Sequence, residues 1–221
     1  MSRILVINPN STEAVTRGID AACEPLRMAV GPAIECVTLK EGPPGIESQQ
    51  HVDGVVAPLV ALVRSREADC SAFVIACYSD PGLHSVREAT RKPVLGIMEC
   101  GLATAMTLGQ KIGVIAILQK SIPRHLRAMG AMGLMDRLAA ELPVGLGVTE
   151  LSDEARTLGR MKEVGLRLRD EHGANVIVMG CAGMARYRDA LADATGLPVV
   201  EPTQAAVAMA VGRVRFQWER A

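Results

Sequence analysis

Two cysteines in this 221-residue chain directly follow apolar runs with β character, a place where reactive groups are often found. Cys77 ends "FVIAC" and Cys181 follows "NVIVMG". A single cysteine in such a place is usually a small core residue. A pair of thiols, however, can invert a carbon stereocentre, because one removes a proton from one face while the other returns a proton to the opposite face. A free thiol has a pKa of about 8.5, close enough to neutrality for both tasks.

The residues after each cysteine offer groups that stabilise negative charge. Residues 79–81 have the composition of a first helical turn, whose N–H groups would lower the pKa of Cys77. We expect Asp80 in this segment to cap a helix rather than to act as a base. Ala182 and Gly183 indicate a tight turn with free backbone N–H groups, which stabilise the enolate oxygen formed when a carbon beside a carbonyl loses its proton.

The strands that must position these thiols occur twice. Lys111 follows Arg3 by 108 positions within similar apolar runs, and the two cysteines lie 104 positions apart. The nearly constant offset indicates two related halves, each of βαβαβαβ type. Strands are predicted at 3–8, 34–39, 72–76 and 93–97, then at 111–117, 147–151 and 175–179, and the segment 195–204 matches 90–99.

Alternating strands and helices predict parallel sheets with helices on both faces, and such sheets bind ligands beyond the carboxyl ends of their strands. The predicted fold class is therefore α/β, with two pseudo-symmetric lobes, each a short parallel four-stranded sheet flanked by helices. The active site would occupy the cleft between them. We place the first lobe at 1–98 plus 204–221 and the second at 99–203.

Three helices are predicted with particular features. Apolar residues at helical spacing predict a helix over roughly 50–67, with a kink at Pro58 because proline disrupts a helix interior. The segment 153–171 is predicted to be helical. A C-terminal helix at about 203–219 is expected to pack back on the first lobe.

Composition excludes several classes of function. The formal net charge is zero and no long run of like charge occurs, which argues against nucleic acid or an anionic membrane as a partner. No leader-like segment opens the chain and no apolar run approaches the ~20 residues that span a bilayer, so we expect a cytoplasmic protein. The six cysteines form no C-x-x-C pair and the histidines do not cluster with them, so neither a metal site nor a disulfide framework is expected.

Five motifs, in order, carry a family resemblance that covers essentially the whole chain. They are "INPNST" (7–12), "ACYSDPGL" (76–83), "PVLGI" (93–97), "GCAGM" (180–184) and "GLPVVEP" (196–202). With them the sequence resembles the aspartate/glutamate/hydantoin racemase superfamily, and within it the hydantoin and allantoin racemase branch. The resemblance implies racemisation without a cofactor by Cys77 and Cys181, a small-molecule substrate and a homo-oligomeric assembly.

The resemblance also implies residues that hold the substrate, in loops after the strands. These are Asn10, Ser11, Tyr78, Ser79, Ala182 and Gly183. A helix N-cap is the competing interpretation for Asn10 and Ser11. The family often has threonines after the first strand of the second lobe, where this chain has Ala116 and Ile117. That departure favours an apolar 5-substituent over the polar ureido group of allantoin.

The leading hypothesis is a two-base proton transfer at C5 of a 5-substituted hydantoin or of allantoin. An aspartate or glutamate racemase and a maleate-isomerase-like enzyme are alternatives of the same superfamily. A decarboxylase of the arylmalonate type keeps only one of the two cysteines, so the presence of both argues against it. A non-catalytic small-molecule binding protein is the alternative from a different class.

Overall fold

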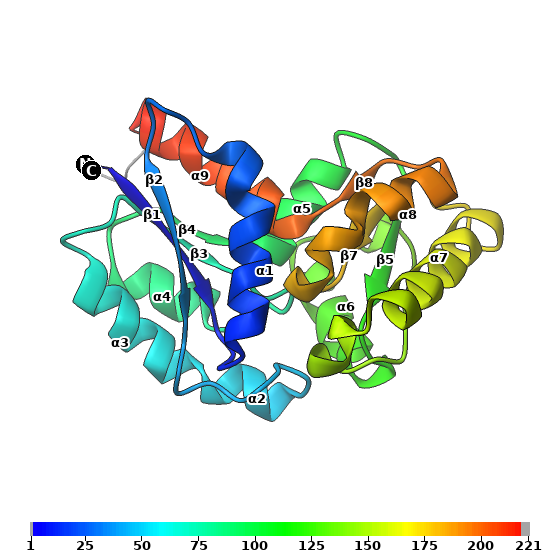
Figure 1. Ribbon diagram of the computed structural model, residues 1–221, viewed down its shortest axis with the longest axis horizontal. Helices are drawn as coiled ribbons and strands as arrows, with labels where there is room; N and C mark the ends of the chain where they lie inside the picture. Colours follow the sequence, from blue (N-terminus) through cyan, green and yellow to red (C-terminus); the bar gives the residue numbers. More distant parts are fainter. Residues whose placement is uncertain (1, 218–221) are drawn as a thin grey trace.

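The computed structural model describes residues 2–217, which form two parallel sheets of four strands (Figure 1). The first sheet has the order β2-β1-β3-β4 and the second the order β6-β5-β7-β8. Their strands are β1 (Arg3–Asn8), β2 (Ala33–Thr38), β3 (Ala72–Ile75), β4 (Val94–Gly96), β5 (Ile112–Ala116), β6 (Leu138–Pro143), β7 (Val176–Met179) and β8 (Val199–Val200). The predicted fold of two pseudo-symmetric α/β lobes is confirmed.

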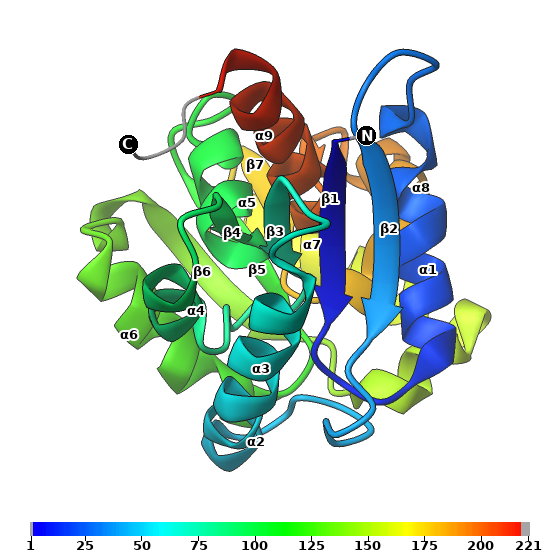
Figure 2. The ribbon, with the colours of Figure 1, turned by 90° about the vertical axis from the view of Figure 1, so that its left-hand side faces the viewer.

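The helices cover both faces of the two sheets, as Figures 1 and 2 show. They are α1 (Glu13–Cys23), α2 (Gln49–Gly54), α3 (Val56–Arg66), α4 (Leu83–Ala89), α5 (Ile97–Ala105), α6 (Ile122–Ala131), α7 (Glu154–Asp170), α8 (Arg188–Thr195) and α9 (Pro202–Phe216). No helix within residues 2–217 has the length and apolar character needed to cross a bilayer.

The internal repeat extends to matched backbone hydrogen bonds. In the first lobe the Ala76 N–H donates to the Ile7 carbonyl at 2.8 Å, and in the second the Gly180 N–H donates to the Ile115 carbonyl, also at 2.8 Å. Each bond fixes the residue just before a cysteine against the end of the first strand of its lobe. The two cysteines are therefore held by the same local geometry.

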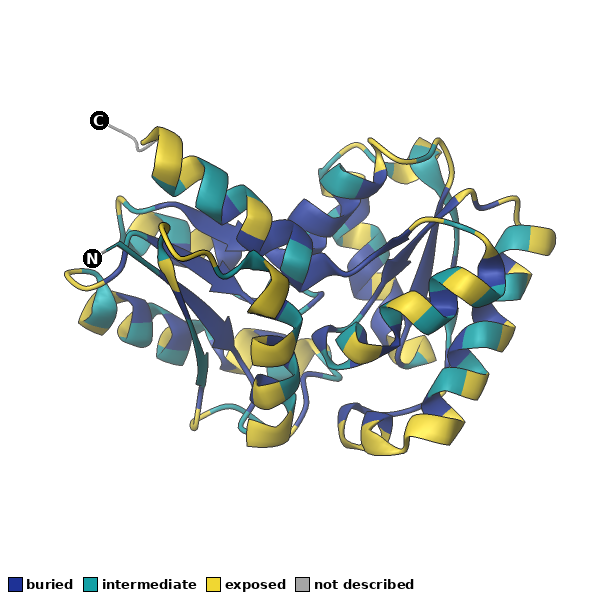
Figure 3. Ribbon diagram, turned by 45° about the horizontal axis from the view of Figure 1, so that its top comes forward, coloured by how far each residue is buried: buried dark blue, intermediate teal, exposed yellow. Residues whose placement is uncertain are grey.

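The central strands owe their position to continuous apolar sequence. All four residues of β3 and all four of β7 have no solvent-exposed surface, as expected for strands covered by helices on both faces. Figure 3 shows the buried strands inside and the exposed faces of the helices outside. At about 25 cal/mol per Å² of apolar surface, this burial is the main force that holds each lobe together.

The helix predicted over 50–67 is divided into α2 and α3, so the predicted kink at Pro58 is wrong in its position. The break lies at Val55, and the Leu59 N–H donates to the Val55 carbonyl at 3.0 Å in the first turn of α3. Pro58 therefore lies in that first turn, where N–H groups have no partner within the helix. Beginning a new helix before Pro58 avoids the cost of proline in a helix interior.

The strand predicted at 147–151 is also wrong, because residues Val148–Ser152 form a 3₁₀ helix. In a strand, the N–H groups of Gly147 and Val148 would bond to a neighbouring strand, but here they bond to carboxylates. The Gly147 N–H donates to Glu150 at 2.8 Å and the Val148 N–H donates to Glu47 at 3.0 Å. The second strand of this lobe is β6, whose sequence "LAAELP" has little β propensity. Its position at the sheet edge tolerates Pro143 as the last residue.

The C-terminal helix α9 follows β8 of the second lobe but packs on the first, as predicted (Figure 1). Its buried residues Ala206 and Val207 share one core cluster with Val6 of β1 and Val74 of β3. It also lies against α5, the helix that leads out of the first lobe. The end of the predicted helix and of the 204–221 segment, residues 218–221, lies outside the described residues, and the boundaries at 98/99 and 203/204 remain a prediction.

Candidate active site

Cys77 and Cys181 line one cavity between the lobes. Each follows the last residue of its central strand, Ile75 of β3 and Met179 of β7, by two positions. The free space between the walls is small, about 30 Å³. The walls come from both lobes and include Asn10, Ile46, Cys77, Tyr78, Ser79, Ile117, Arg124, His125, Val148, Cys181, Ala182 and Gly183.

Both thiols are proton-bearing at neutral pH. Burial raises the pKa of Cys77 to about 11, while a hydrogen bond from the Ser79 N–H and the charge of Arg124 act in the opposite direction. Burial raises the pKa of Cys181 to about 12, and a hydrogen bond from the Gly183 N–H opposes it. The backbone N–H groups of Ser79 and Gly183 thus point at the sulfur atoms themselves. Either cysteine needs a group that accepts its proton before it can act as a base.

The helix start predicted at residues 79–81 is absent, and a tight turn takes its place. The Asp80 N–H donates to the Cys77 carbonyl at 2.9 Å, and α4 begins only at Leu83. Asp80 has a positive φ of 42°. It caps a helix, as predicted, but the helix is α5 and not α4. The two carboxylate oxygens of Asp80 accept 2.9 Å hydrogen bonds from the N–H groups of Met98 and Glu99. Local N–H groups, and not a helix dipole, therefore stabilise a Cys77 thiolate.

The turn after Cys181 repeats this arrangement. The Met184 N–H donates to the Cys181 carbonyl at 3.1 Å, and a short 3₁₀ helix spans Ala182–Tyr187. A Cβ at residue 183 would lie 3.6 Å from the Cys181 sulfur. Ala182 and Gly183 both line the cavity, as a role in holding substrate requires.

Only part of the loop after β1 lines the cavity. Asn10 lines it and is 6% exposed, with its side-chain oxygen accepting bonds from the Thr12 N–H at 2.9 Å and the Asn8 amide at 3.0 Å. Ser11 does not line the cavity, and its N–H donates to the Pro43 carbonyl at 3.0 Å. The N-cap of α1 is Thr12, without a side-chain cap bond.

Tyr78 and Ser79 both contact residues of the second lobe. The Tyr78 ring meets the His125 ring edge to face, with ring centres 5.2 Å apart. The Ser79 hydroxyl accepts a 2.9 Å bond from Nε of Arg124 and lies 3.1 Å from Nε2 of His125. These contacts bring the loop of Cys77 against α6.

Sequence reasoning missed three buried polar residues beside the thiols: Arg124 and His125 of α6, and Glu141 of β6. The His125 Nδ1 lies 2.5 Å from a carboxylate oxygen of Glu141. The motif "PRHL" of residues 123–126 was a weak indication of buried polar residues. Its two basic residues lie on the same helix as Ile122 and Met129, which are buried. Glu141 gave none, because its strand was misplaced.

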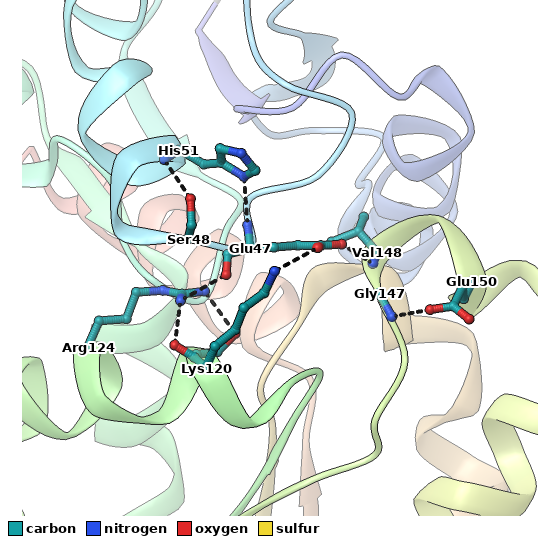
Figure 4. A network of polar contacts seen from close by, with 9 residues as sticks. Glu47, Ser48, His51, Lys120, Arg124, Gly147, Val148 and Glu150 are labelled. Atoms are coloured by element: carbon teal, nitrogen blue, oxygen red, sulfur yellow. Dashed lines mark hydrogen bonds and ion pairs between the residues drawn. The ribbon is translucent and has the colours of Figure 1, made fainter.

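A further contact, which we name the clasp, joins Glu47 of the first lobe to three residues of the second, Lys120, Arg124 and Val148 (Figure 4). The Glu47 carboxylate accepts a 3.0 Å bond from the Val148 N–H and lies 3.5 Å from the Lys120 ammonium. Its carbonyl oxygen accepts a 3.3 Å bond from Arg124. Ile46 and Val148 line the cavity, so the clasp adjoins the site.

The family model described as "Asp/Glu/Hydantoin racemase" matches residues 4–210. The chain belongs to this racemase family. A curated relative, the hydantoin racemase of Paenarthrobacter aurescens, is 34% identical over 221 residues, which cover 98% of this chain and 93% of the relative. With the family model, this relative makes the chain an isomerase of the racemase class.

Solved structures agree with the family assignment. The allantoin racemase of Klebsiella pneumoniae has a TM-score of 0.94 and 29% identity, covering 100% of this chain and 91% of that protein. The glutamate racemase RacE1 of Bacillus anthracis has a TM-score of 0.73 at 17% identity, covering 98% of this chain and 83% of that one, and shares the fold.

Of the two positions where the resemblance implies threonines, one lies on the cavity wall. Ile117 lines the cavity, whereas Ala116, the last residue of β5, is fully buried and does not line it. Only one of the two replaced positions therefore faces the site. Across residues 2–217, no cluster of three or more His, Cys, Asp or Glu side chains is arranged to hold a metal ion.

Proposed function

We propose that this enzyme racemises a 5-substituted hydantoin, with an apolar 5-substituent preferred over the ureido group of allantoin. The observation that carries the proposal is the position of Cys77 and Cys181 at matched strand ends, one from each lobe, on the walls of one cavity. No cofactor is invoked, because two thiols supply both proton transfers. The relatives named above support hydantoins or allantoin as the substrate class.

In the proposed reaction one cysteine, as thiolate, takes the proton from C5. The ring carbonyl next to C5 receives the electron pair and becomes an enolate oxygen. The other cysteine, as thiol, donates its proton to the opposite face of C5, and its sulfur becomes the thiolate. The guanidinium of Arg124 borders the cavity and favours the negative charge that the intermediate carries.

The charges around the cavity favour a neutral ring over an acidic substrate. Among the described residues that line it, Arg124 is the one permanently charged side chain. Maleate carries two negative charges, of which a single cation neutralises one, and aspartate and glutamate also bring an ammonium group, for which no carboxylate is found among the described lining residues. Ile46, Ile117 and Val148 provide apolar surface instead, which fits a benzyl, isobutyl or methylthioethyl group.

The test follows optical activity of single enantiomers at neutral pH. The panel is benzyl-, isobutyl-, methylthioethyl- and ureido-hydantoin beside L-glutamate, L-aspartate and maleate, with a blank without enzyme. We expect racemisation of the apolar hydantoins, with uptake of solvent deuterium at C5 measured by NMR. Cys77→Ser and Cys181→Ser should each lower the rate at least 100-fold. If both variants racemised the substrate near the wild-type rate, the two-thiol mechanism would be disproved. If only an acidic substrate were turned over, the proposed hydantoin substrate would be wrong.

A homo-oligomer remains a prediction. Sedimentation of the purified chain would test it, and a single species at the monomer mass would reject it.

A further inference from the structure

A chain of three polar side chains leads away from the Cys77 sulfur into the second lobe. The Ser79 hydroxyl lies 3.1 Å from Nε2 of His125, and Nδ1 of His125 lies 2.5 Å from Oε1 of Glu141. The side chains of His125 and Glu141 are only 2% and 1% exposed. Ser79 follows Cys77 by two residues, both line the cavity, and the Ser79 side chain is near enough to influence the pKa of the thiol. Sulfur, hydroxyl, imidazole and carboxylate therefore form one continuous series.

The direction of each hydrogen bond follows from what the groups can donate. A carboxylate only accepts, so Nδ1 of His125 carries a hydrogen and points it at Glu141. Nε2 of the neutral ring is then an acceptor. The Ser79 oxygen already accepts from Arg124 at 2.9 Å, which leaves its own hydrogen to donate to His125 and its second lone pair to receive a proton from Cys77.

We propose that His125, held by Glu141, accepts the proton of Cys77 through the Ser79 hydroxyl, and that Cys181 has no equivalent relay. The S–H bond of Cys77 breaks as an O–H bond forms at Ser79, and the original Ser79 hydrogen moves to Nε2 of His125. Thiol and imidazole become thiolate and imidazolium, with no net gain or loss of protons. His125 and Glu141 act through Ser79, so they are positioning and relay residues. Their part in turnover rests on the proposed racemase function.

The carboxylate of Glu141 is incompletely hydrogen-bonded and lies against the His125 ring. The second carboxylate oxygen of Glu141 is buried and has no hydrogen-bond partner among the described residues. A buried carboxylate without full hydrogen bonding is costly unless a cation neutralises it. The imidazolium that the relay forms at His125 lies in direct contact with this carboxylate, in the arrangement that orients and stabilises the charged base of a hydrolytic triad.

Other titratable groups around the thiols do not provide this route. Arg124 faces Cys77 but stays protonated, and Asp80 is committed to the N–H groups of α5. Cys181 faces Cys77, Glu47 and Glu201. Glu47 belongs to the clasp, and Glu201 caps α9 through the N–H groups of Thr203 and Gln204.

The second lobe lacks the bridging hydroxyl. With the offset of the two cysteines, Gly183 stands where Ser79 stands in the first lobe, and it offers Cys181 only a backbone N–H. The two otherwise matched thiols are therefore unequal. Cys77 has a nearby proton acceptor, whereas no described side chain is hydrogen-bonded to Cys181 in the same way.

The experiment measures alkylation of each cysteine by iodoacetamide in the substrate-free protein between pH 6 and 10, with peptides quantified by mass spectrometry. A thiol with a pKa of about 11 is about one part in ten thousand thiolate at pH 7, and without help its rate rises tenfold per pH unit. Through the relay, sulfur attacks as its proton passes to His125 and iodide leaves. We expect Cys77 to show a pH-independent rate below pH 8, at least tenfold above the value extrapolated from high pH. Cys181 should show none.

His125→Gln and Ser79→Ala should each remove this plateau and lower the Cys77 rate at pH 7 at least tenfold, with Cys181 unchanged within twofold. Glu141→Gln keeps an acceptor for Nδ1 but removes the charge, so an intermediate loss of the plateau is expected.

His84→Gln, which changes an exposed histidine of α4, is the matched control. Circular dichroism identifies variants that fold, and Glu141→Gln tests the relay should His125→Gln not fold. Folded variants with the wild-type Cys77 profile would overturn the relay. Iodoacetamide replaces the substrate, so this result is independent of whether a hydantoin is turned over.

Discussion

The carboxylate of Glu47 accepts a 3.0 Å hydrogen bond from the backbone N–H of Val148, a residue 101 positions later in the other lobe. This bond lies beside a cavity that Val148 helps to line and whose free volume is about 30 Å³. Small-molecule sites usually have volumes of about 300–1,000 Å³. We therefore expect the lobes to separate when a substrate enters, which would break the clasp and re-form it in each turnover.

The clasp predicts different results for two substitutions of Glu47. Glu47→Ala removes the acceptor for the Val148 N–H, and the loss of one hydrogen bond of about 1 kcal/mol corresponds to a roughly fivefold increase in KM. Glu47→Gln keeps an oxygen for Val148 and loses only the ion pair with Lys120, whose side chain is 58% exposed. At this exposure the pair is screened by solvent, and a contribution of about 0.5 kcal/mol corresponds to a change in KM of roughly twofold.

Steady-state racemisation kinetics on the best hydantoin measure both variants, with Lys120→Met as the control that removes the same ion pair from the other side. Equal damage from Glu47→Gln and Glu47→Ala would mean that charge, and not the bond to Val148, closes the site.

Ile117→Thr should change the substrate preference. Ile117 lines the cavity, so a hydroxyl there offers a hydrogen bond to a polar 5-substituent and removes apolar contact. We expect the ratio of kcat/KM for ureido-hydantoin over isobutyl-hydantoin to rise about 5- to 10-fold, the size of one polar or one methylene contact. Ala116→Thr is the contrasting variant, because Ala116 is fully buried outside the cavity lining. It should lower the unfolding free energy by about 1–3 kcal/mol through overpacking, without the shift in preference.

Alanine substitutions at Gly180 and Gly183 should have different effects, the first on stability and the second on activity. A Cβ at residue 180 would lie 2.6 Å from the Ile115 carbonyl oxygen, a backbone atom that cannot move aside. Gly180→Ala should therefore cost roughly 2 kcal/mol or more of unfolding free energy. At residue 183 the nearest atoms are Leu151 Cδ1 at 3.2 Å and the Cys181 sulfur at 3.6 Å. Gly183→Ala should fold with less than about 1 kcal/mol lost, yet lower kcat/KM at least tenfold, because the methyl group occupies the reacting side.

Urea denaturation and racemisation assays on both glycine variants provide the comparison. A stable, active Gly180→Ala protein would contradict the close approach of the loop to β5.

Asp80 predicts a pH-dependent difference in stability. Burial raises its pKa to about 7, although the N–H groups of Glu99 and Met98 act in the opposite direction. The unfolded value is about 3.9, so the folded state binds this proton more tightly. The contribution of Asp80 to stability is thus fully present below about pH 4 and is lost as the pH rises through 7. Asp80→Asn cannot ionise and keeps one acceptor for the cap of α5.

Relative to wild type, Asp80→Asn should therefore become progressively more stable between pH 5 and 8, by about 1 kcal/mol or more. Chemical denaturation at each pH measures the difference in unfolding free energy. The difference should be flat in Glu88→Gln, an exposed carboxylate change on α4. A flat line for Asp80→Asn as well would show that burial does not control this carboxyl.

The sequence was sufficient to find the two lobes and the two thiols because both depend on local patterns that occur twice. Cys77 and Cys181 follow central strands with continuous apolar sequence, and the repeat pairs them. His125 and Arg124 were missed because their burial arises only when α6 of one lobe docks against the loop of Cys77 in the other. No periodicity in α6 encodes that contact.

The errors have a similar origin. Residues 147–151 contain Val148 and Thr149, which favour strands, but the carboxylate of Glu47, far away in sequence, accepts a hydrogen bond from the Val148 N–H and stabilises a 3₁₀ turn. Glu141 was not predicted as a site residue because its strand, β6, has weak β propensity and forms through pairing with β5. Tertiary partners that local sequence does not record decided both cases.

Helix α9 determines when the first lobe can finish folding during synthesis. The apolar surface formed by β1 and β3 is covered by residues such as Ala206 and Val207, which the ribosome adds about 130 residues or more after β3 (Ala72–Ile75). A nascent first lobe therefore exposes part of its core until the second lobe has been made. The first lobe therefore completes its core only after the second lobe has been translated, and α9 joins both lobes into one folding unit.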